Sequence, residues 1–302
     1  MIAQGFSAAA VEALARSGLD VDDVRRAVEV ALDEDLRYGP DATTGATVPA
    51  GAVAEAVLAT RRAGTLAGLP VVRAVLDAVV GAGAYRLAAE RADGDRLAPG
   101  DAVARVTAPV RGLLTAERTA LNFLCHLSGV ATATSAWVDA VAGTGCRIRD
   151  TRKTLPGLRL LEKYAVRCGG GVNHRLGLGD AVLVKDNHVV AAGSVSAAIA
   201  AVRERAPDLT CEVEVTTLDE LDEALAAGAP LVLLDNMRVE QCAEAVRRAR
   251  GTGAALEASG GLTLDVARAY AETGVDYLAV GALTHSAPAL DLGLDMDGAS
   301  RT

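Results

Sequence analysis

Between residue 146 and the C-terminal region, short apolar runs alternate with amphipathic stretches, and this alternation constrains the fold more than any other feature. The runs have the length of strands and lie at 147–150, 181–184, 210–215, 231–234, 255–257 and 277–280. Helical patterns follow most of the later runs, at 194–205, 218–227, 239–250 and 263–272. Repeats of this kind, spaced by roughly 20 to 30 residues, predict βα units that close as a parallel α/β barrel.

A doubly wound open sheet is the alternative arrangement of such units. It normally carries a glycine-rich turn after its first strand, but neither GxGxxG nor GxxxxGK[ST] occurs in the chain. Residues 20–117 are different, because helical and β-rich stretches there are separated by glycine and proline pairs. They predict a compact α+β domain, followed by a long apolar helix over 114–140.

Composition excludes several classes of protein. The chain has 302 residues, 51% of them hydrophobic, so it can bury a full core. Its net charge of −9 disfavours nucleic-acid binding, which normally needs a basic face. We expect no membrane span, since the longest stretch without charge, Thr119–Val138, contains Asn122 and His126. No secretory signal is evident and the five cysteines form no CxxC pair, so we expect a cytoplasmic protein with reduced thiols and no resident metal.

The basic residues are unevenly distributed. Only three are lysines, Lys153, Lys163 and Lys185, and the segment 147–185 holds nine Lys or Arg against three acids, a local balance of +6. A solvated charged face could produce this cluster, but several of its members follow predicted strands. In α/β barrels the active site lies at the C-terminal ends of the strands. We therefore predict a pocket for a strongly anionic substrate, formed by Arg152, Lys153, His174, Arg175 and Lys185.

Two carboxylates and two glycine-rich segments also follow predicted strands. Glu214 ends one strand and Asp235 another, and such acids suit ribose hydroxyls, hydrated magnesium or a developing positive charge. Because side chains alternate along a strand, Glu212 shares a face with Glu214. Backbone amides after the last strands of a barrel often bind phosphate, and the candidates here are Ser259, Gly260 and Gly261, then Gly281, Ala282 and Leu283.

Several segments, taken together and in order, resemble the quinolinate phosphoribosyltransferase family. They are ALDEDLRYGPDATT at 31–44, ERTALN at 117–122, DTRKTLPG at 150–157, GGGVNHR at 169–175, VKDNH at 184–188, EVE at 212–214, LDNM at 234–237 and EASGG at 257–261. The resemblance implies an N-terminal α/β sandwich domain over 1–117 and an incomplete, TIM-like α/β barrel over 118–285. It also places the C-terminal tail, 286–302, against the first domain.

The activity implied by the resemblance joins quinolinate to 5-phosphoribosyl 1-pyrophosphate, with release of pyrophosphate and carbon dioxide, and yields nicotinate mononucleotide for NAD synthesis. Magnesium travels with the pyrophosphate. The implied assembly is a homodimer in which each N-terminal domain caps the partner's barrel, so that Arg118 reaches the partner's site. Assembly beyond the dimer is left open.

Carried over position by position, the resemblance implies a role for each candidate residue. Arg152, His174, Arg175 and Lys185 would hold the quinolinate carboxylates, and Lys153, with Thr151 beside it, would lie where the two substrates meet. Glu214 and Asp235 would act on the ribose side. The phosphate loops would contain Ser259, Gly260, Gly261, Gly281, Ala282 and Leu283, with His285 nearby.

Three other interpretations stay open at this point. A paralogous pyrophosphorylase of the same fold could act on another anionic ring, and a non-catalytic barrel could bind phosphoanions without turnover. A barrel aldolase that uses Lys185 as a Schiff base would need a desolvated lysine.

Overall fold

The computed structural model describes residues 5–296, whose contacts divide into two compact units. The first unit comprises residues 5–133, 155–169 and 286–296, and the second comprises 134–154 and 170–285. The chain crosses from the first unit to the second within helix α5 (Val110–Ala140). This division groups residues by their contacts and does not test the predicted domain boundaries at 117/118 and 285/286. Those boundaries stay predictions. Residues 297–302 of the predicted tail lie outside the described residues.

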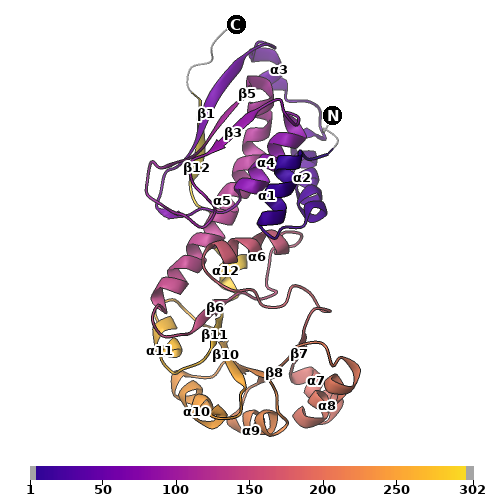
Figure 1. Cartoon of the computed structure of the whole chain (residues 1–302), viewed down its shortest axis with the longest axis vertical. Coiled ribbons are helices and arrows are strands. Elements are labelled where there is room, and N and C mark those ends of the chain that lie inside the picture. The colour runs from indigo at the N-terminus through magenta and orange to yellow at the C-terminus, as the bar shows by residue number, and fades with distance from the viewer. Residues whose placement is uncertain (1–4, 297–302) are drawn as a thin grey trace. The chain divides into compact units, whose positions relative to one another are not determined.

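An antiparallel sheet of four strands, in the order β12-β1-β5-β3, forms one layer of the first unit (Figure 1). Strand β1 alternates exposed and buried residues, as expected for a sheet with one face on the core. From residue 286 the chain returns to this unit, where β12 pairs with β1. The strands are β1 (Val53–Thr60), β3 (Arg86–Ala89), β5 (Ala102–Pro109) and β12 (Leu292–Met296), with a separate pair β2 (Gly64–Thr65) and β4 (Arg96–Leu97).

Helix α4 is the buried centre of the helical layer, and α1 and α2 contact it. Its N-terminus begins after Gly68, which has a positive φ of 117° and cannot cap the helix with a side chain. Asp93 supplies the cap instead, because it accepts hydrogen bonds from the backbone N–H groups of Gly68 and Leu69. The helices of this unit are α1 (Ala8–Arg16), α2 (Val21–Leu36), α3 (Ala42–Thr47), α4 (Leu69–Val79), α6 (Arg159–Cys168) and most of α5.

The second unit contains a six-stranded, fully parallel sheet in the order β6-β11-β10-β9-β8-β7. Its edge strands β6 and β7 are not paired with each other, and Arg149 of β6 instead makes an isolated bridge to Val172. The barrel is therefore incomplete, and the predicted fold class is confirmed. The strands are β6 (Arg147–Arg149), β7 (Val182–Val184), β8 (Cys211–Val215), β9 (Leu231–Asp235), β10 (Ala255–Ser259) and β11 (Tyr277–Ala279).

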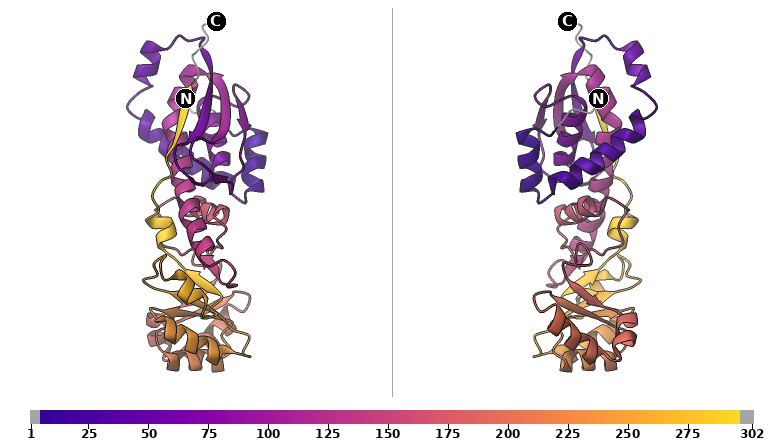
Figure 2. Two further views of the ribbon diagram at one scale, coloured as in Figure 1. Left: turned by 90° about the vertical axis from the view of Figure 1, so that its left-hand side faces the viewer. Right: turned by 90° about the vertical axis from the view of Figure 1, so that its right-hand side faces the viewer.

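Helices α8, α9 and α10 cover the outer side of these strands (Figure 1), and two further views of the same layer are given in Figure 2. Each observed strand lies within two residues of its predicted bounds. The helix predicted over 263–272 was wrong at its start, because residues 263–266 form a turn with an i to i+3 hydrogen bond from Val266 to Thr263. The helices are α7 (Asp186–Ala192), α8 (Val195–Arg205), α9 (Leu218–Ala226), α10 (Val239–Ala249), α11 (Ala267–Ala271) and α12 (Ala282–His285).

None of the helices within residues 5–296 is both long enough and apolar enough to span a membrane. All five cysteines lie in the described part of the chain and are free thiols.

Candidate active site

A cavity of about 610 Å³ lies in the second unit, at the C-terminal ends of its parallel strands. Of the sixteen residues predicted from the sequence to form the site, eleven line this cavity. They are Thr151, Arg152, Lys153, His174, Arg175, Lys185, Glu214, Asp235, Ser259, Gly260 and Gly261.

The strand register brings these residues together. Asp235 and Ser259 are direct partners across β9 and β10, and Glu214 pairs with Leu233 across β8 and β9. Since side chains alternate along each strand, Leu233 and Asp235 share one face, as do Glu257 and Ser259. The cavity is therefore lined by one face of the sheet, to which strands β7 to β11 contribute residues.

The other predicted residues occupy different positions. A Cβ atom on Gly281 would lie 2.9 Å from Lys153 Cδ and 3.4 Å from His285 Nε2, so Gly281 and His285 adjoin the cavity. Ala282 is exposed and Leu283 is buried, so Leu283 can offer a ligand only its backbone. Arg118 is an exposed residue of α5 in the first unit and does not line the cavity.

Two arginines on the basic side of the cavity have unsatisfied groups. The Nε atoms of Arg152 and Arg175 are buried, and neither has a hydrogen-bond partner in residues 5–296. Burial, together with the neighbouring charge of Arg152, lowers the pKa of Arg175. Buried N–H donors without partners are uncommon in folded proteins. Two guanidinium groups that repel each other, each with a buried Nε that lacks an acceptor, therefore indicate a site for an anion.

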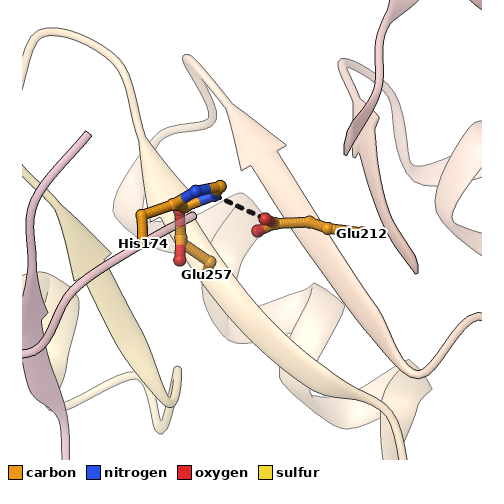
Figure 3. A group of neighbouring side chains, drawn as sticks. All are labelled: His174, Glu212 and Glu257. Carbon is orange, nitrogen blue, oxygen red and sulfur yellow. Dashed lines mark hydrogen bonds and ion pairs between the residues drawn. The ribbon is translucent and has the colours of Figure 1, made fainter. Parts of the chain in front are cut away.

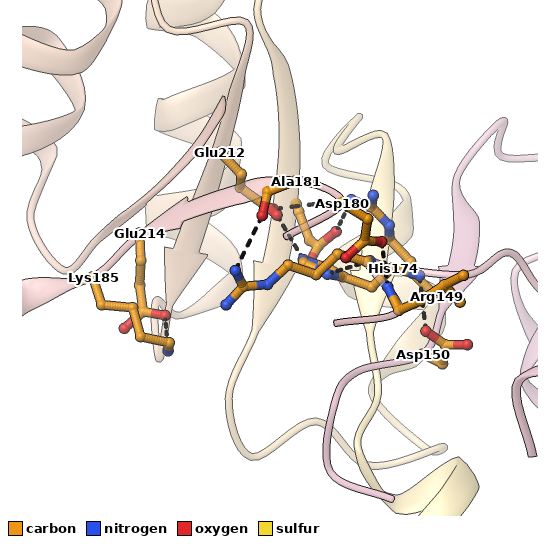
Figure 4. Close-up of polar contacts among 11 residues, drawn as sticks. Arg149, Asp150, His174, Asp180, Ala181, Lys185, Glu212 and Glu214 are labelled. Atoms are coloured by element: carbon orange, nitrogen blue, oxygen red, sulfur yellow. Dashed lines mark hydrogen bonds and ion pairs between the residues drawn. The ribbon is translucent and has the colours of Figure 1, made fainter. Parts of the chain in front are cut away.

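Lys185, on the basic side of the cavity, forms an ion pair with Glu214 on the acidic side. Its Nζ lies 2.5 Å from Glu214 Oε2, and Lys185 follows β7 where Glu214 lies on the adjacent β8 (Figure 4). An ion pair with a carboxylate favours the protonated ammonium, whereas a Schiff-base lysine must be an unprotonated amine. The geometry of Lys185 therefore disfavours the aldolase interpretation.

The predicted phosphate loop at 259–261 depends on backbone geometry. Gly260 and Gly261 have positive φ values of 96° and 60°, and a Cβ on Gly260 would overlap Asn236 Oδ1. Asn236 itself has φ 55°, the one positive φ among the non-glycine residues that the structure describes. Since α11 begins only at Ala267, the amides of this loop do not belong to a helix N-terminus. A phosphate at this loop would therefore be bound by loop amides rather than by a helix N-terminus.

Three buried residues, His174, Glu212 and Glu257, form a cluster at the wall of the cavity (Figure 3), and Arg149 lies close to them (Figure 4). His174 Nε2 lies 2.6 Å from Glu212 Oε2, and Arg149 Nη1 lies 2.7 Å from Glu257 Oε2. Burial and the charge of Glu212 raise the pKa of Glu257 to about 8, against the opposing effect of Arg149. His174, Glu212 and Glu257 have the ligand types of a metal site. However, the guanidinium of Arg149 already supplies the positive charge that a cation would bring.

Reasoning from the sequence missed five residues of the cavity. Leu183, Leu233 and Ala279 form apolar parts of its wall, and Asn236 and Glu257 add polar groups. A charged residue within an apolar strand, as in ALEAS at 255–259, was the available signal for Glu257. Asn236 follows Asp235 at the end of a predicted strand, and that polar strand end was its signal, although its backbone conformation is not visible in the sequence.

Fold and site together define a class of protein: an incomplete α/β barrel that binds an anionic ligand at its strand ends, with carboxylates opposite the cations. Comparison with known families specifies this class further. Residues 41–128 match the N-terminal domain of quinolinate phosphoribosyl transferase, and residues 130–295 match the C-terminal domain. The chain belongs to the quinolinate phosphoribosyltransferase family.

Individual relatives agree with this assignment. The chain is 58% identical over 282 residues to the Mycobacterium leprae protein named nicotinate-nucleotide pyrophosphorylase [carboxylating], covering 93% of this chain and 99% of that one. The human protein of the same name is 41% identical, with coverage of 85% and 87%. The solved structure of nicotinate-nucleotide pyrophosphorylase from Francisella tularensis has a TM-score of 0.86 and 38% identity, and covers 92% of this chain and 98% of that one.

Proposed function

We propose that this chain transfers the phosphoribosyl group of 5-phosphoribosyl 1-pyrophosphate to quinolinate, with decarboxylation, to give nicotinate mononucleotide, pyrophosphate and carbon dioxide. The observation that carries the proposal is a pair of half-buried arginines, Arg152 and Arg175, whose Nε donors lack acceptors in a cavity that also contains Glu214 and Asp235. A dicarboxylate supplies the missing acceptors. The carboxylating pyrophosphorylases named among the relatives have the corresponding activity.

The two sides of the cavity perform different tasks in this reaction. Arg152, Arg175 and Lys185 hold the carboxylates of quinolinate and orient its ring nitrogen toward the ribose. As pyrophosphate departs, positive charge develops on the ribose carbon, and Glu214 and Asp235 stabilise it electrostatically. Lys153, whose backbone carbonyl is fixed by the Thr284 hydroxyl, holds the anions that meet at the reacting centre.

Decarboxylation follows from the charge of the product ring. Once the ring nitrogen carries the ribosyl group it is cationic, so it stabilises the electron pair that stays on the ring carbon when the carbon–carboxylate bond breaks. A proton then replaces carbon dioxide on that ring carbon. The chain therefore needs no separate electron acceptor for this step.

Magnesium enters this scheme as part of the substrate, bound to the pyrophosphate of phosphoribosyl pyrophosphate. Glu214 and Asp235 offer carboxylate oxygens, which are the ligand type that Mg²⁺ prefers, directly or through its waters. The proposed location is the cytoplasm, since five free thiols suit a reducing compartment.

The proposed assembly is a homodimer with shared active sites, in which Arg118 acts on the partner's substrate. Its support is that Arg118 is exposed on α5 rather than at a strand end, while its guanidinium suits a carboxylate. Arg118→Ala and Lys153→Ala homodimers should each be nearly inactive. Mixed dimers should regain activity, because one of their two sites combines wild-type Arg118 with wild-type Lys153. Heterodimers that form yet stay inactive would contradict the shared site.

Product analysis tests the reaction itself. Quinolinate, phosphoribosyl pyrophosphate and Mg²⁺ are incubated with the protein, and nicotinate mononucleotide is identified by mass spectrometry alongside carbon dioxide from carboxyl-labelled quinolinate. Nicotinate and other anionic rings serve as competing substrates. Turnover of another ring in preference to quinolinate would support the paralogous pyrophosphorylase instead, and binding of both substrates without product would support a non-catalytic barrel.

A further inference from the structure

Both ring nitrogens of His174 are engaged by the protein. Nδ1 accepts a hydrogen bond of 2.8 Å from the backbone N–H of Arg175. Since a backbone N–H can only donate, Nδ1 carries no proton, and the ring proton lies on Nε2. Nε2 donates it to Glu212 Oε2 at 2.6 Å (Figure 4). The buried ring therefore has neither a donor nor an acceptor left for a carboxylate of the substrate.

The segment that carries His174 is also held from the opposite side. Asp150, which is fully buried at the end of β6, accepts the backbone N–H of His174 through Oδ1 at 2.8 Å. Its Oδ2 accepts the Asn173 side-chain amide at 2.6 Å. Asp150 holds the backbone and Glu212, on β8, holds the ring, so the orientation of His174 is determined by two separate strands.

Arg175 is the residue that this arrangement controls. Its backbone N–H is held by His174, and its Nη1 donates to the carbonyl of Ala181 at 3.2 Å. Its Nε is buried without a hydrogen-bond partner, and Arg175 lines the cavity. A guanidinium presents two parallel donors to a carboxylate only when its plane is fixed, so a small rotation of the Arg175 backbone would spoil that fit.

We propose that His174 is a positioning residue for Arg175: Glu212 holds the Nε2–H tautomer of His174, whose Nδ1 fixes the backbone that aims the Arg175 guanidinium at the anionic substrate. His174 then makes no contact with the substrate, in contrast to the role implied by family resemblance. The inference deepens the proposed function and rests on it only for the identity of the anion, quinolinate.

The tautomer can be measured on the protein without substrate. The chain has four histidines, so ¹⁵N-histidine labelling and long-range ¹H–¹⁵N correlation spectra resolve each ring, and His174→Gln identifies the relevant signals. We expect a protonated Nε2 and an unprotonated Nδ1 for His174. A proton on Nδ1, or on both nitrogens, would overturn the proposal whether or not the protein turns over quinolinate.

Variants of Glu212 separate positioning from general damage to the core. Glu212→Gln keeps an acceptor oxygen for Nε2–H and should retain quinolinate affinity, whereas Glu212→Met removes it and should weaken quinolinate binding about tenfold or more. Affinity for phosphoribosyl pyrophosphate, and kcat at saturating quinolinate, should change about twofold at most. Val213→Ala is the matched control, because Val213 is buried on the same strand but on its other face. Equal losses for both substrates in Glu212→Met would contradict the proposal.

Variants of His174 itself complete the test. Asparagine places an oxygen near the position of Nδ1, so His174→Asn should recover much of the quinolinate affinity that His174→Ala loses. If His174 bound the substrate through its ring, Asn and Ala would be equally defective and Glu212→Met would retain affinity. Calorimetric binding of quinolinate supplies this readout without turnover, so failure of the proposed reaction and failure of the positioning role are distinguishable.

Discussion

The cavity at the strand ends of the second unit and a cavity of the first unit are nearly equal in size, about 610 and about 590 Å³. Both contain arginines. The cavity of the first unit is lined by parts of α1, α4, β3 and α6, and its basic residues are Arg16, Arg73, Arg91 and Arg167.

The polar groups of the first-unit cavity already serve the fold. Asp93 Oδ2 accepts the N–H of Gly68 at 2.7 Å and the Tyr164 hydroxyl at 2.5 Å, and burial raises its pKa. Arg16 pairs with Glu12, and Arg167 donates to the carbonyl of Ser17.

In the second-unit cavity, by contrast, buried donors of Arg152 and Arg175 have no acceptor. Volume does not distinguish these cavities, and the first-unit cavity has more arginines, four against two. What distinguishes them is whether the protein itself satisfies the buried polar groups, since an unsatisfied group is costly unless a ligand completes it.

The largest effect is expected for a substitution on the acidic side of the second-unit cavity, with a matched substitution in the first-unit cavity as its control. Asp235→Asn should leave the fold intact and lower kcat by about 10²- to 10³-fold, because it removes a charge that acts on the ribose side in the transition state. Asp93→Asn, the equivalent change in the first-unit cavity, should leave the kcat of the folded protein unaltered. Steady-state kinetics on both variants make the test, and wild-type turnover in Asp235→Asn would remove this residue from the site.

A smaller effect is expected on the basic side. Arg152→Ala should weaken quinolinate binding by about 1.5 to 3 kcal/mol, the range for a hydrogen bond to a charged group, with little change in affinity for phosphoribosyl pyrophosphate. Arg73→Ala, its control in the first-unit cavity, should leave both affinities unchanged. Titration calorimetry measures all four constants. Equal weakening of the two substrates by Arg152→Ala would count against its assignment to quinolinate.

The reverse experiment tests the structural role of the first-unit cavity. Asp93→Ala removes the cap of α4 and an acceptor of Tyr164, so the free energy of unfolding should fall by about 1 to 3 kcal/mol. Denaturant unfolding measures this change. The variant should keep wild-type kcat/KM at temperatures where it is folded, and a loss of quinolinate affinity at full stability would show that this cavity belongs to the site.

Stability should also depend on pH through Glu257. The pKa of Glu257 is raised from 4.5 to about 8 in the folded protein, so the folded state binds this proton more tightly than the unfolded state does. Its contribution to stability is complete below about pH 4.5 and is lost as the pH rises toward 8. Glu257→Gln should therefore show a smaller decline in the free energy of unfolding between pH 5 and 8 than the wild type. Parallel declines in urea titrations would refute the assignment to Glu257.

Local sequence patterns predicted much of the second unit. The runs at 231–234 and 277–280 correspond to strands β9 and β11, and the stretch at 218–227 corresponds to α9. Hydrophobic periodicity is a property of residues that are close in the sequence, so it predicts helices and strands without knowledge of the tertiary structure. The start of α11 was mispredicted, because the choice between a turn and a first helical turn at 263–266 depends on weak local energies.

The sequence by itself determined which strands end in charged residues, such as Lys185 and Asp235, and hence that a cation-rich site faces acids. Only the tertiary structure decided the strand order, which makes Asp235 a neighbour of Ser259, and decided which charges are already satisfied. His174 is the clearest case, since its ring nitrogens are taken by Glu212, 38 positions away, and by its neighbour Arg175. Hydrogen bonding depends on distances between atoms in space, and no pattern of residue types along a chain contains those distances.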